Sequence, residues 1–261
     1  MALKYKRILL KISGEALGGE KGMGFDEPTM DAICGGVKKA HELGVQIGIV
    51  VGGGNFWRGR SSGKMERTLA DKIGMLATVM NALAVSDKLE QLGVPTEVFT
   101  SITMPQVAPA FTRKDALRAM DEARSLCSAA ALANPFFSYR YGYCLRAVEV
   151  SADVMFKATM VDGVYDKDPH KYRMPKSTIP LPLPKVLEDQ LAVMDGTAAT
   201  CAATTSCPFW CLIWPTRTTS HGLCRARTWA RWSTRLSIAP RCNCIRLDRA
   251  AAAQCAACMD Q

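Results

Sequence analysis

The 261 residues are enough for one large domain or two small ones, and a hydrophobic content of 48% is enough for a buried core. No run of about 18 apolar residues occurs, which argues against a transmembrane helix, and the N-terminus lacks the long apolar stretch of a signal peptide. We therefore expect a cytoplasmic protein with no membrane partner.

The net charge of +9 would be typical of a nucleic-acid-binding protein, but its distribution argues against that class. Residues 1–200 hold 25 Lys and Arg against 22 Asp and Glu, whereas residues 201–261 hold 8 Arg, 2 Asp, and neither Lys nor Glu. Eight of the 11 Cys and four of the five Trp also lie beyond residue 200. This composition is unusual for a globular segment, so we predict a domain over residues 1–200 and an aberrant tail over 201–261.

Apolar runs of strand length alternate with stretches of helix length along the first half of the chain. Strands are predicted at residues 6–13, 45–51 and 95–100, and helices at 27–43, 66–92 and 113–124. Pro28 lies near the start of the first helix, and Gly44 follows its end. Further along, a helix end and a strand are predicted within 147–157, a polar loop at 159–169, and a loop with a helix at 178–194. The alternation predicts an α/β fold with a mostly parallel sheet.

Two segments that follow predicted strands have the residue types of phosphate-binding turns. In Lys11–Gly14 (KISG), a lysine at a strand end supplies positive charge and the turn supplies backbone N–H groups. In 51–59 (VGGGNFWRG), three glycines allow close approach of the backbone to a ligand, and Arg58 can clamp a phosphate. A surface lysine and an ordinary glycine turn are the alternatives, because neither segment is a Walker or GxGxxG motif.

Three further segments carry less information when each is taken alone. Asp71 lies in ADKIGMLAT (70–78), where a lone helical carboxylate is usually solvated. The segment 134–138 (NPFFS) is a turn with two aromatic residues, which a core-packed loop would also explain. The segment 157–169 (KATMVDGVYDKDP) offers polar groups and one aromatic ring to a nucleotide, but is also an ordinary polar loop.

Taken together and in this order, the five segments resemble the bacterial UMP kinases of the amino-acid-kinase family. The resemblance covers about residues 4–124, 134–138 and 145–200. It implies a three-layer αβα sandwich with a mostly parallel central sheet, its C-terminal part being doubtful. It also implies transfer of the ATP γ-phosphoryl group to UMP, giving UDP and ADP, with Mg²⁺ bound to ATP, in pyrimidine biosynthesis. A cytoplasmic homohexamer, activated by GTP and inhibited by UTP, would be typical of the family.

The resemblance also assigns roles to individual residues. ATP would be bound by Lys11, Ile12, Ser13, Gly14, Gly54, Arg58, Thr159, Tyr165 and Asp168. UMP would be bound by Gly53, Asp71, Asn134, Pro135, Phe136, Phe137 and Ser138. Lys11 and Arg58 would be catalytic, and no resident metal site is expected. Phosphoryl transfer agrees with these residue types, because it needs positioning and neutralised oxygens more than a covalent catalyst.

Three windows depart from the family pattern, at residues 125–133, 139–144 and 208–215. Each becomes similar to the family when its reading frame is shifted by one base; the last can then read Pro-Ile-Leu-Val-Phe-Asp-Leu-Ala, a buried strand. We interpret the windows as frame slips, in the gene or in its sequencing, rather than as a divergent paralogue. If the chain exists as written, we expect a tail without its strand and helix, a charge reversal at Arg140 near the reacting phosphates, and poor activity.

Other functions remain open at this point. A catalytically impaired relative, or an aspartate, glutamate or carbamate kinase, would share the fold, although ADKIGMLAT and NPFF favour UMP. A zinc-binding tail would need regular ligand spacing, and the tail pairs Cys207–Cys211, Cys242–Cys244 and Cys255–Cys258 are irregular. Arginines near Trp229 and Trp232 could contact RNA, but the frame-slip interpretation explains the tail better.

Overall fold

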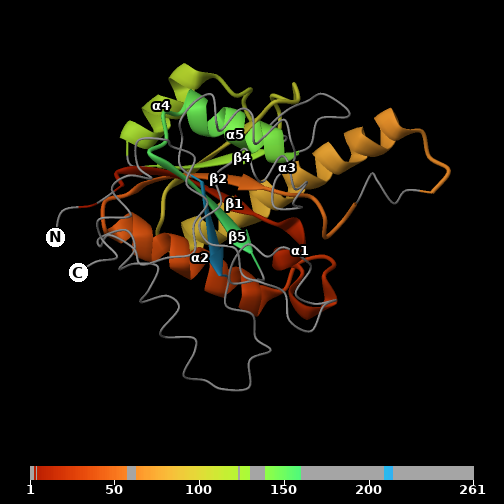
Figure 1. Cartoon of the computed structure of the whole chain (residues 1–261), viewed down its shortest axis with the longest axis horizontal. Coiled ribbons are helices and arrows are strands. Elements are labelled where there is room, and N and C mark those ends of the chain that lie inside the picture. Colours follow the sequence, from red (N-terminus) through yellow and green to blue (C-terminus); the bar gives the residue numbers. More distant parts are fainter. Residues whose placement is uncertain are drawn as a thin grey trace, which may run out of the picture.

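A six-stranded sheet forms the centre of the molecule (Figure 1). The computed structural model describes residue 3 and residues 5–57, 63–122, 124–129, 139–159 and 209–213. The strands are β1 (Arg7–Ile12), β2 (Gln46–Val51), β3 (Thr96–Thr100), β4 (Ser125–Ala129), β5 (Val154–Thr159) and β6 (Phe209–Ile213). They lie in the order β3-β4-β2-β1-β5-β6, and every neighbouring pair is parallel.

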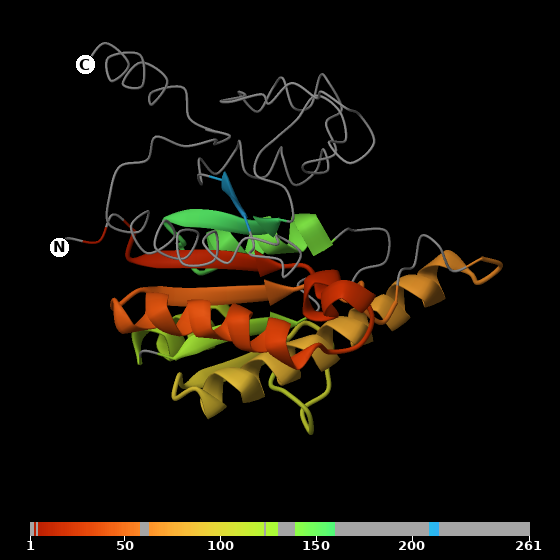
Figure 2. The same ribbon diagram turned by 90° about the horizontal axis from the view of Figure 1, so that it is seen from below.

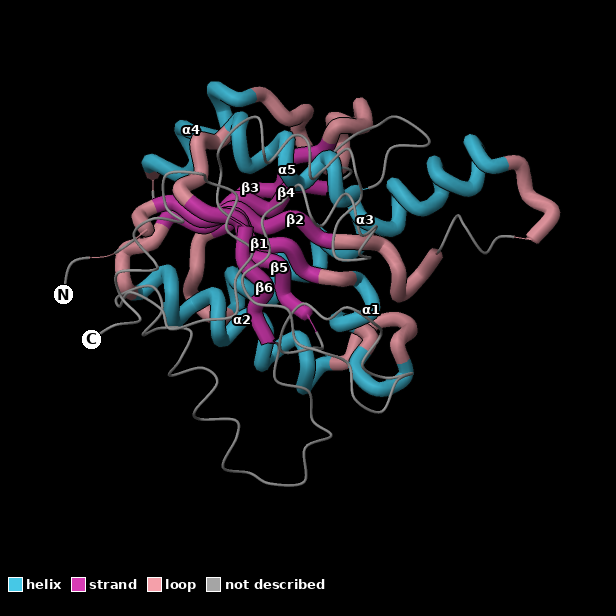
Figure 3. Tube along the Cα trace, in the orientation of Figure 1, coloured by secondary structure: helices cyan, strands magenta, loops and turns pink. Residues whose placement is uncertain are grey.

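Helices cover both faces of this sheet. The described helices are α1 (Gly14–Leu17), η1 (Gly19–Lys21), α2 (Glu27–Glu42), α3 (Arg67–Gln91), α4 (Arg113–Asp121) and α5 (Tyr139–Glu149). Figure 3 shows α4 and α5 on one side of the strands and α2 on the other, and α3 packs beside α2. The expected three-layer αβα sandwich with a parallel sheet is therefore confirmed.

Alternation along β1 divides the core into two layers, because successive side chains of a strand point to opposite faces. Ile8, Leu10 and Ile12 belong to one apolar cluster with residues of α2 and α3, such as Ile33 and Val85. Leu9 points to the other face, where a side chain added at Gly48 would touch both Leu9 and Met120 of α4. A strand that is buried on both faces reads as a continuous apolar run, which is why β1 could be predicted.

Local signals set the ends of the two long helices. The Asp26 side chain caps α2 by accepting a hydrogen bond from the Thr29 N–H at 3.0 Å, Pro28 lies in the first turn, and Gly44 follows with φ of 82°. Glu66 caps α3 by accepting from the N–H groups of Thr68 and Leu69.

Helix α3 has 25 residues and extends beyond the sheet at one end (Figure 2). By length and apolar composition it alone among the described helices could cross a membrane, but helices packed in a protein core meet the same criteria, and α3 packs against β2, β3 and β4. The length and composition of α3 are therefore weak evidence for a membrane span.

The windows predicted to be anomalous hold regular structure where the structure describes them. Residues 125–129 form β4, and residues 139–149 form α5, of which the sequence predicted only the end, from residue 147. The expectation that the tail lacks its strand is wrong, because Phe209–Ile213 forms β6 beside β5, in register with residues 155–159. A run of five apolar residues and free backbone hydrogen-bonding groups are sufficient for an edge strand, whatever the reading frame. The rest of 201–261 lies outside the described residues.

Candidate active site

The connections of the chain change direction between the neighbouring strands β1 and β5. The chain leaves β1 towards β2 on one side, and leaves β5 towards β6 on the other. Because all strands are parallel, their carboxyl ends meet at one edge, and ligands of open parallel sheets bind outside such a switch point. The segments that follow β1 and β2 at this edge are the Ser13-Gly14 turn and residues 52–55, which we call the glycine loop.

Two lysines lie side by side at this switch point. Lys11 of β1 pairs in register with Lys157 of β5, so both side chains extend to the same face of the sheet. Lys11 is only 4% exposed and Lys157 is half-buried. Two cationic side chains that start side by side on one face of the sheet make this edge locally positive, and a positive edge attracts a polyanion. The pair is therefore suited to a polyphosphate.

The Ser13-Gly14 turn and the glycine loop are in close contact. The Gly52 N–H donates to the Ile12 carbonyl at 2.9 Å, which continues the β1–β2 pairing past the strand ends. A Cβ atom at Gly14 would lie 2.4 Å from the Gly52 carbonyl oxygen and 2.6 Å from the Gly54 nitrogen. Only glycine fits here, which explains the residue type in the KISG segment.

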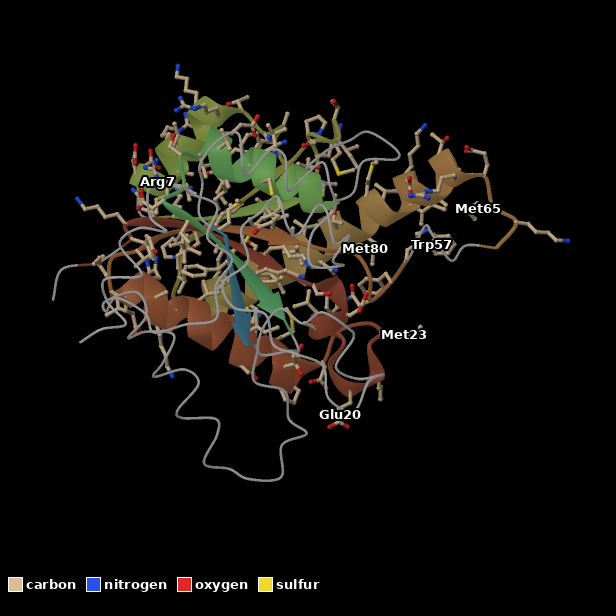
Figure 4. The ribbon with its side chains drawn as sticks, viewed as in Figure 1. Arg7, Glu20, Met23, Trp57, Met65 and Met80 are labelled. Carbon is tan, nitrogen blue, oxygen red and sulfur yellow. The ribbon has the colours of Figure 1, made fainter. Side chains whose placement is uncertain are left out.

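Helix α3 lies against the other side of the glycine loop. A Cβ atom at Gly53 would lie 2.8 Å from the Gly74 carbonyl oxygen and 2.9 Å from Ala77 Cβ, both in α3. Trp57, just after the loop, donates from Nε1 to the Ala70 carbonyl at 2.9 Å and lies alongside α3 (Figure 4). The loop is thus clamped between β1 and α3.

Asp71 follows Ala70 in α3, so it lies next to the contact between α3 and Trp57. Its two carboxylate oxygens each accept from Nε of Arg67 at 2.8 Å, and its side chain is 16% exposed. Asp71 is therefore a partly buried, ion-paired group, which differs from the solvated carboxylate that a lone helical aspartate predicts.

The structure brings together the predicted site residues that it describes. Lys11, Ile12, Ser13, Gly14 and Gly54 lie at the β1 end, and Gly53 and Asp71 lie on the α3 side. Ile12 is fully buried and takes part through its carbonyl group alone. The predicted site residues Arg58, Tyr165, Asp168 and 134–138 lie outside the described residues, and Thr159 is described only as the last residue of β5.

Sequence reasoning did not include Lys157 in the site. It opens the KATMVDGVYDKDP segment inside a strand, as Lys11 opens KISG, and this similarity of position was the available signal. Strand pairing between residues 11 and 157 is non-local, so the sequence alone did not place them together.

Comparison with known proteins agrees with this geometry. The model of the amino acid kinase family matches residues 6–181. The chain belongs to the amino acid kinase family. Among solved structures, UMP kinase from Bacillus anthracis is similar at a TM-score of 0.76 and 29% identity, covering 87% of this chain and 93% of the other. UMP kinase from Ureaplasma parvum is similar at a TM-score of 0.75 and 27% identity, covering 83% and 92%. The chain is thus a kinase of this fold.

Proposed function

We propose that this amino acid kinase family member transfers the γ-phosphoryl group of ATP to UMP, giving ADP and UDP. The observation that carries the proposal is the lysine pair Lys11 and Lys157 at the switch point, with the glycine loop beside it. The similarity to two UMP kinases, over most of the chain, supports UMP as the acceptor. The ADKIGMLAT segment, which lies on α3 against the loop and resembles that of the UMP kinases, also supports it.

The β1 side of the glycine loop would hold the donor. Lys11 and Lys157 would neutralise the transferred phosphoryl oxygens, and Arg58 would add a third cation, whose guanidinium group is planar and rigid. Backbone N–H groups near Gly14 and Gly54 would cradle the ATP phosphates. We assign Thr159, Tyr165 and Asp168 to the ATP nucleoside, as the resemblance implies.

The α3 side would hold the acceptor. Gly53 and Asp71 would contact UMP, together with the 134–138 turn. The UMP phosphate is itself the nucleophile, so the protein needs to hold it in line with the γ-phosphorus and supplies no covalent nucleophile. Clamping of the glycine loop between β1 and α3 would give that alignment.

Magnesium fits this site as part of the nucleotide complex. Among the described residues no three His, Cys, Asp or Glu side chains are grouped for a metal ion, whereas lysines and glycine amides are the partners that a polyphosphate prefers. Mg²⁺ in kinases is held largely by phosphates and water, and it neutralises phosphate charge when bound. A cytoplasmic homohexamer activated by GTP and inhibited by UTP belongs to the same proposal.

The acceptor is tested by offering UMP, CMP, aspartate, glutamate and carbamate in parallel and measuring ADP formation. We expect the highest kcat/KM with UMP, and little turnover in a Lys11→Gln variant of unchanged fold. A higher kcat/KM with an amino acid or with carbamate would replace UMP kinase by another kinase of the family.

A folded protein that turns over none of these acceptors would favour the impaired relative. Resequencing codons 120–261 then decides between the explanations, because a continuous frame would show that the natural protein has an intact acceptor turn.

A further inference from the structure

Two buried asparagines join the glycine loop to α3. Asn55 ends the loop and is 2% exposed, and Asn81 lies within α3 and is fully buried. Their amide groups face each other in a reciprocal pair. Asn81 Nδ2 donates to Asn55 Oδ1 at 2.6 Å, and Asn55 Nδ2 donates to Asn81 Oδ1 at 3.1 Å.

The remaining amide hydrogens extend this pair to the backbone. Asn81 Nδ2 also donates to the Gly52 carbonyl at 2.6 Å, and Asn55 Nδ2 also donates to the Gly24 carbonyl at 2.8 Å. All four amide hydrogens are thus used, and turning either amide would bring oxygen against oxygen. Of the common side chains that fit this volume, only asparagine supplies both donors and an acceptor here.

One side chain therefore holds both ends of the glycine loop. Asn81 bonds to Gly52 at the start of the loop and to Asn55 at its end, 29 and 26 residues away in sequence. Both ends also face the Ser13-Gly14 turn, because a Cβ atom at Gly14 would lie 2.4 Å from Gly52 O and 2.7 Å from Asn55 Oδ1. A shift of Asn81 would accordingly move the loop relative to the turn that follows Lys11.

We propose that Asn81 is a positioning residue for phosphoryl transfer, acting through the Gly52 carbonyl and Asn55 without touching substrate. The proposal rests on the proposed kinase function. A buried polar network holds one geometry when all its donors and acceptors are hydrogen-bonded. In-line phosphoryl transfer is sensitive to displacements of about 1 Å. The pair also holds the 18–26 turn, since the Gly24 N–H donates to the Asn55 carbonyl at 3.2 Å.

The test compares Asn81→Ala and Asn81→Ser with a matched control, Ser86→Ala. Ser86 is also a buried polar residue of α3, but its hydroxyl pairs with Thr96 Oγ1 of β3, away from the glycine loop. For each variant we would measure the melting temperature, kcat, and KM for ATP and UMP. We expect kcat to fall about 10- to 100-fold in the Asn81 variants, with both KM values changed by less than about threefold. Ser86→Ala should lower the melting temperature and leave kcat within about twofold.

Three results would overturn the proposal. The first is a kcat of the Asn81 variants within about twofold of that of the original protein. The second is a loss of kcat in Ser86→Ala as large as that in the Asn81 variants. The third is failure of both Asn81 variants to fold, which would assign the pair to folding instead.

Failure of the proposed kinase function gives a different result, in which the original protein transfers a phosphoryl group to no acceptor. Hydrogen–deuterium exchange of the glycine-loop amides, residues 52–55, then becomes the readout. Exchange should be faster in Asn81→Ala and unchanged in Ser86→Ala, because only Asn81 bonds to both ends of the loop. Equal exchange in all three proteins would overturn the positioning role.

Discussion

Replacing Gly14 by alanine tests the contact between the Ser13-Gly14 turn and the glycine loop. The added Cβ atom would lie 2.4 Å from the Gly52 carbonyl oxygen, 2.6 Å from the Gly54 nitrogen and 2.7 Å from Asn55 Oδ1. Two of these neighbours are backbone atoms and the third is fixed by the asparagine pair, so no flexible side chain can give way. The loop itself must move.

The size of the movement follows from the same distances. Ordinary contact begins at 3.4 Å, so the loop has to retreat by about 1 Å (3.4 − 2.4). Overpacking of this kind costs about 1–3 kcal/mol of unfolding free energy. A displacement of about 1 Å at reacting groups lowers the rate by about 100-fold. We therefore expect Gly14→Ala to remain folded, with an unfolding free energy lower by about 1–3 kcal/mol, and to lose about 100-fold in kcat/KM.

Gly35→Ala is the matched control, because Gly35 lies inside α2 and a Cβ atom there would meet nothing within 4 Å. Alanine at this helical position should stabilise the protein by about 0.5–1 kcal/mol and leave kcat/KM unchanged. Urea unfolding gives the stabilities, and coupled detection of ADP gives the rates. Near-normal kcat/KM in Gly14→Ala would refute the argument, because it would mean that the loop position does not govern transfer.

Further predictions concern other parts of the same site and the protein core. Lys157→Gln should lower kcat/KM for ATP about tenfold or more, because it removes a charged contact to phosphate. The control Lys88→Gln removes an ion pair of 2.7 Å to Asp31 and should leave kcat/KM unchanged. Equal effects of the two substitutions would show that Lys157 is not part of the site. Gly53→Ala should push α3 away from the glycine loop and raise KM for UMP more than KM for ATP in steady-state kinetics. An effect on KM for ATP alone would contradict the assignment of UMP to the α3 side of the loop. Burial raises the pKa of the Cys34 thiol to about 12, and that of Cys127 also lies well above its ordinary value. Since the thiolate is the reactive form, iodoacetamide at pH 8 should spare both in the native protein and label both in urea; peptide mass spectrometry showing native labelling would contradict their burial.

The sequence predicted the elements whose signals are local. β1 and β2 are nearly continuous apolar runs, and α2 has a proline in its first turn and a glycine just beyond its end, so their bounds agree with the structure to within a residue or two. The parallel α/β class followed from the alternation of such elements. The glycines of the site were also found, because a turn after a buried strand needs no partner to be recognised.

What the sequence did not predict depends on contacts between distant residues. The pairing of Lys11 with Lys157, and of Asn55 with Asn81, arises only when strands and helices pack. β6 was missed because its five residues have neither helical nor alternating period and lie in a tail of unusual composition. Only the end of α5 was predicted, because the start of its sequence, Tyr139–Glu149, departs from the pattern of the related kinases.

The central claim is tested most directly by following the phosphorus NMR spectrum of the protein with MgATP and UMP. The account predicts that UDP and ADP appear in equal amounts, and that neither appears with Lys11→Gln in place of the original protein. ADP formation without UDP, or UDP formation that Lys11→Gln leaves unchanged, would contradict it.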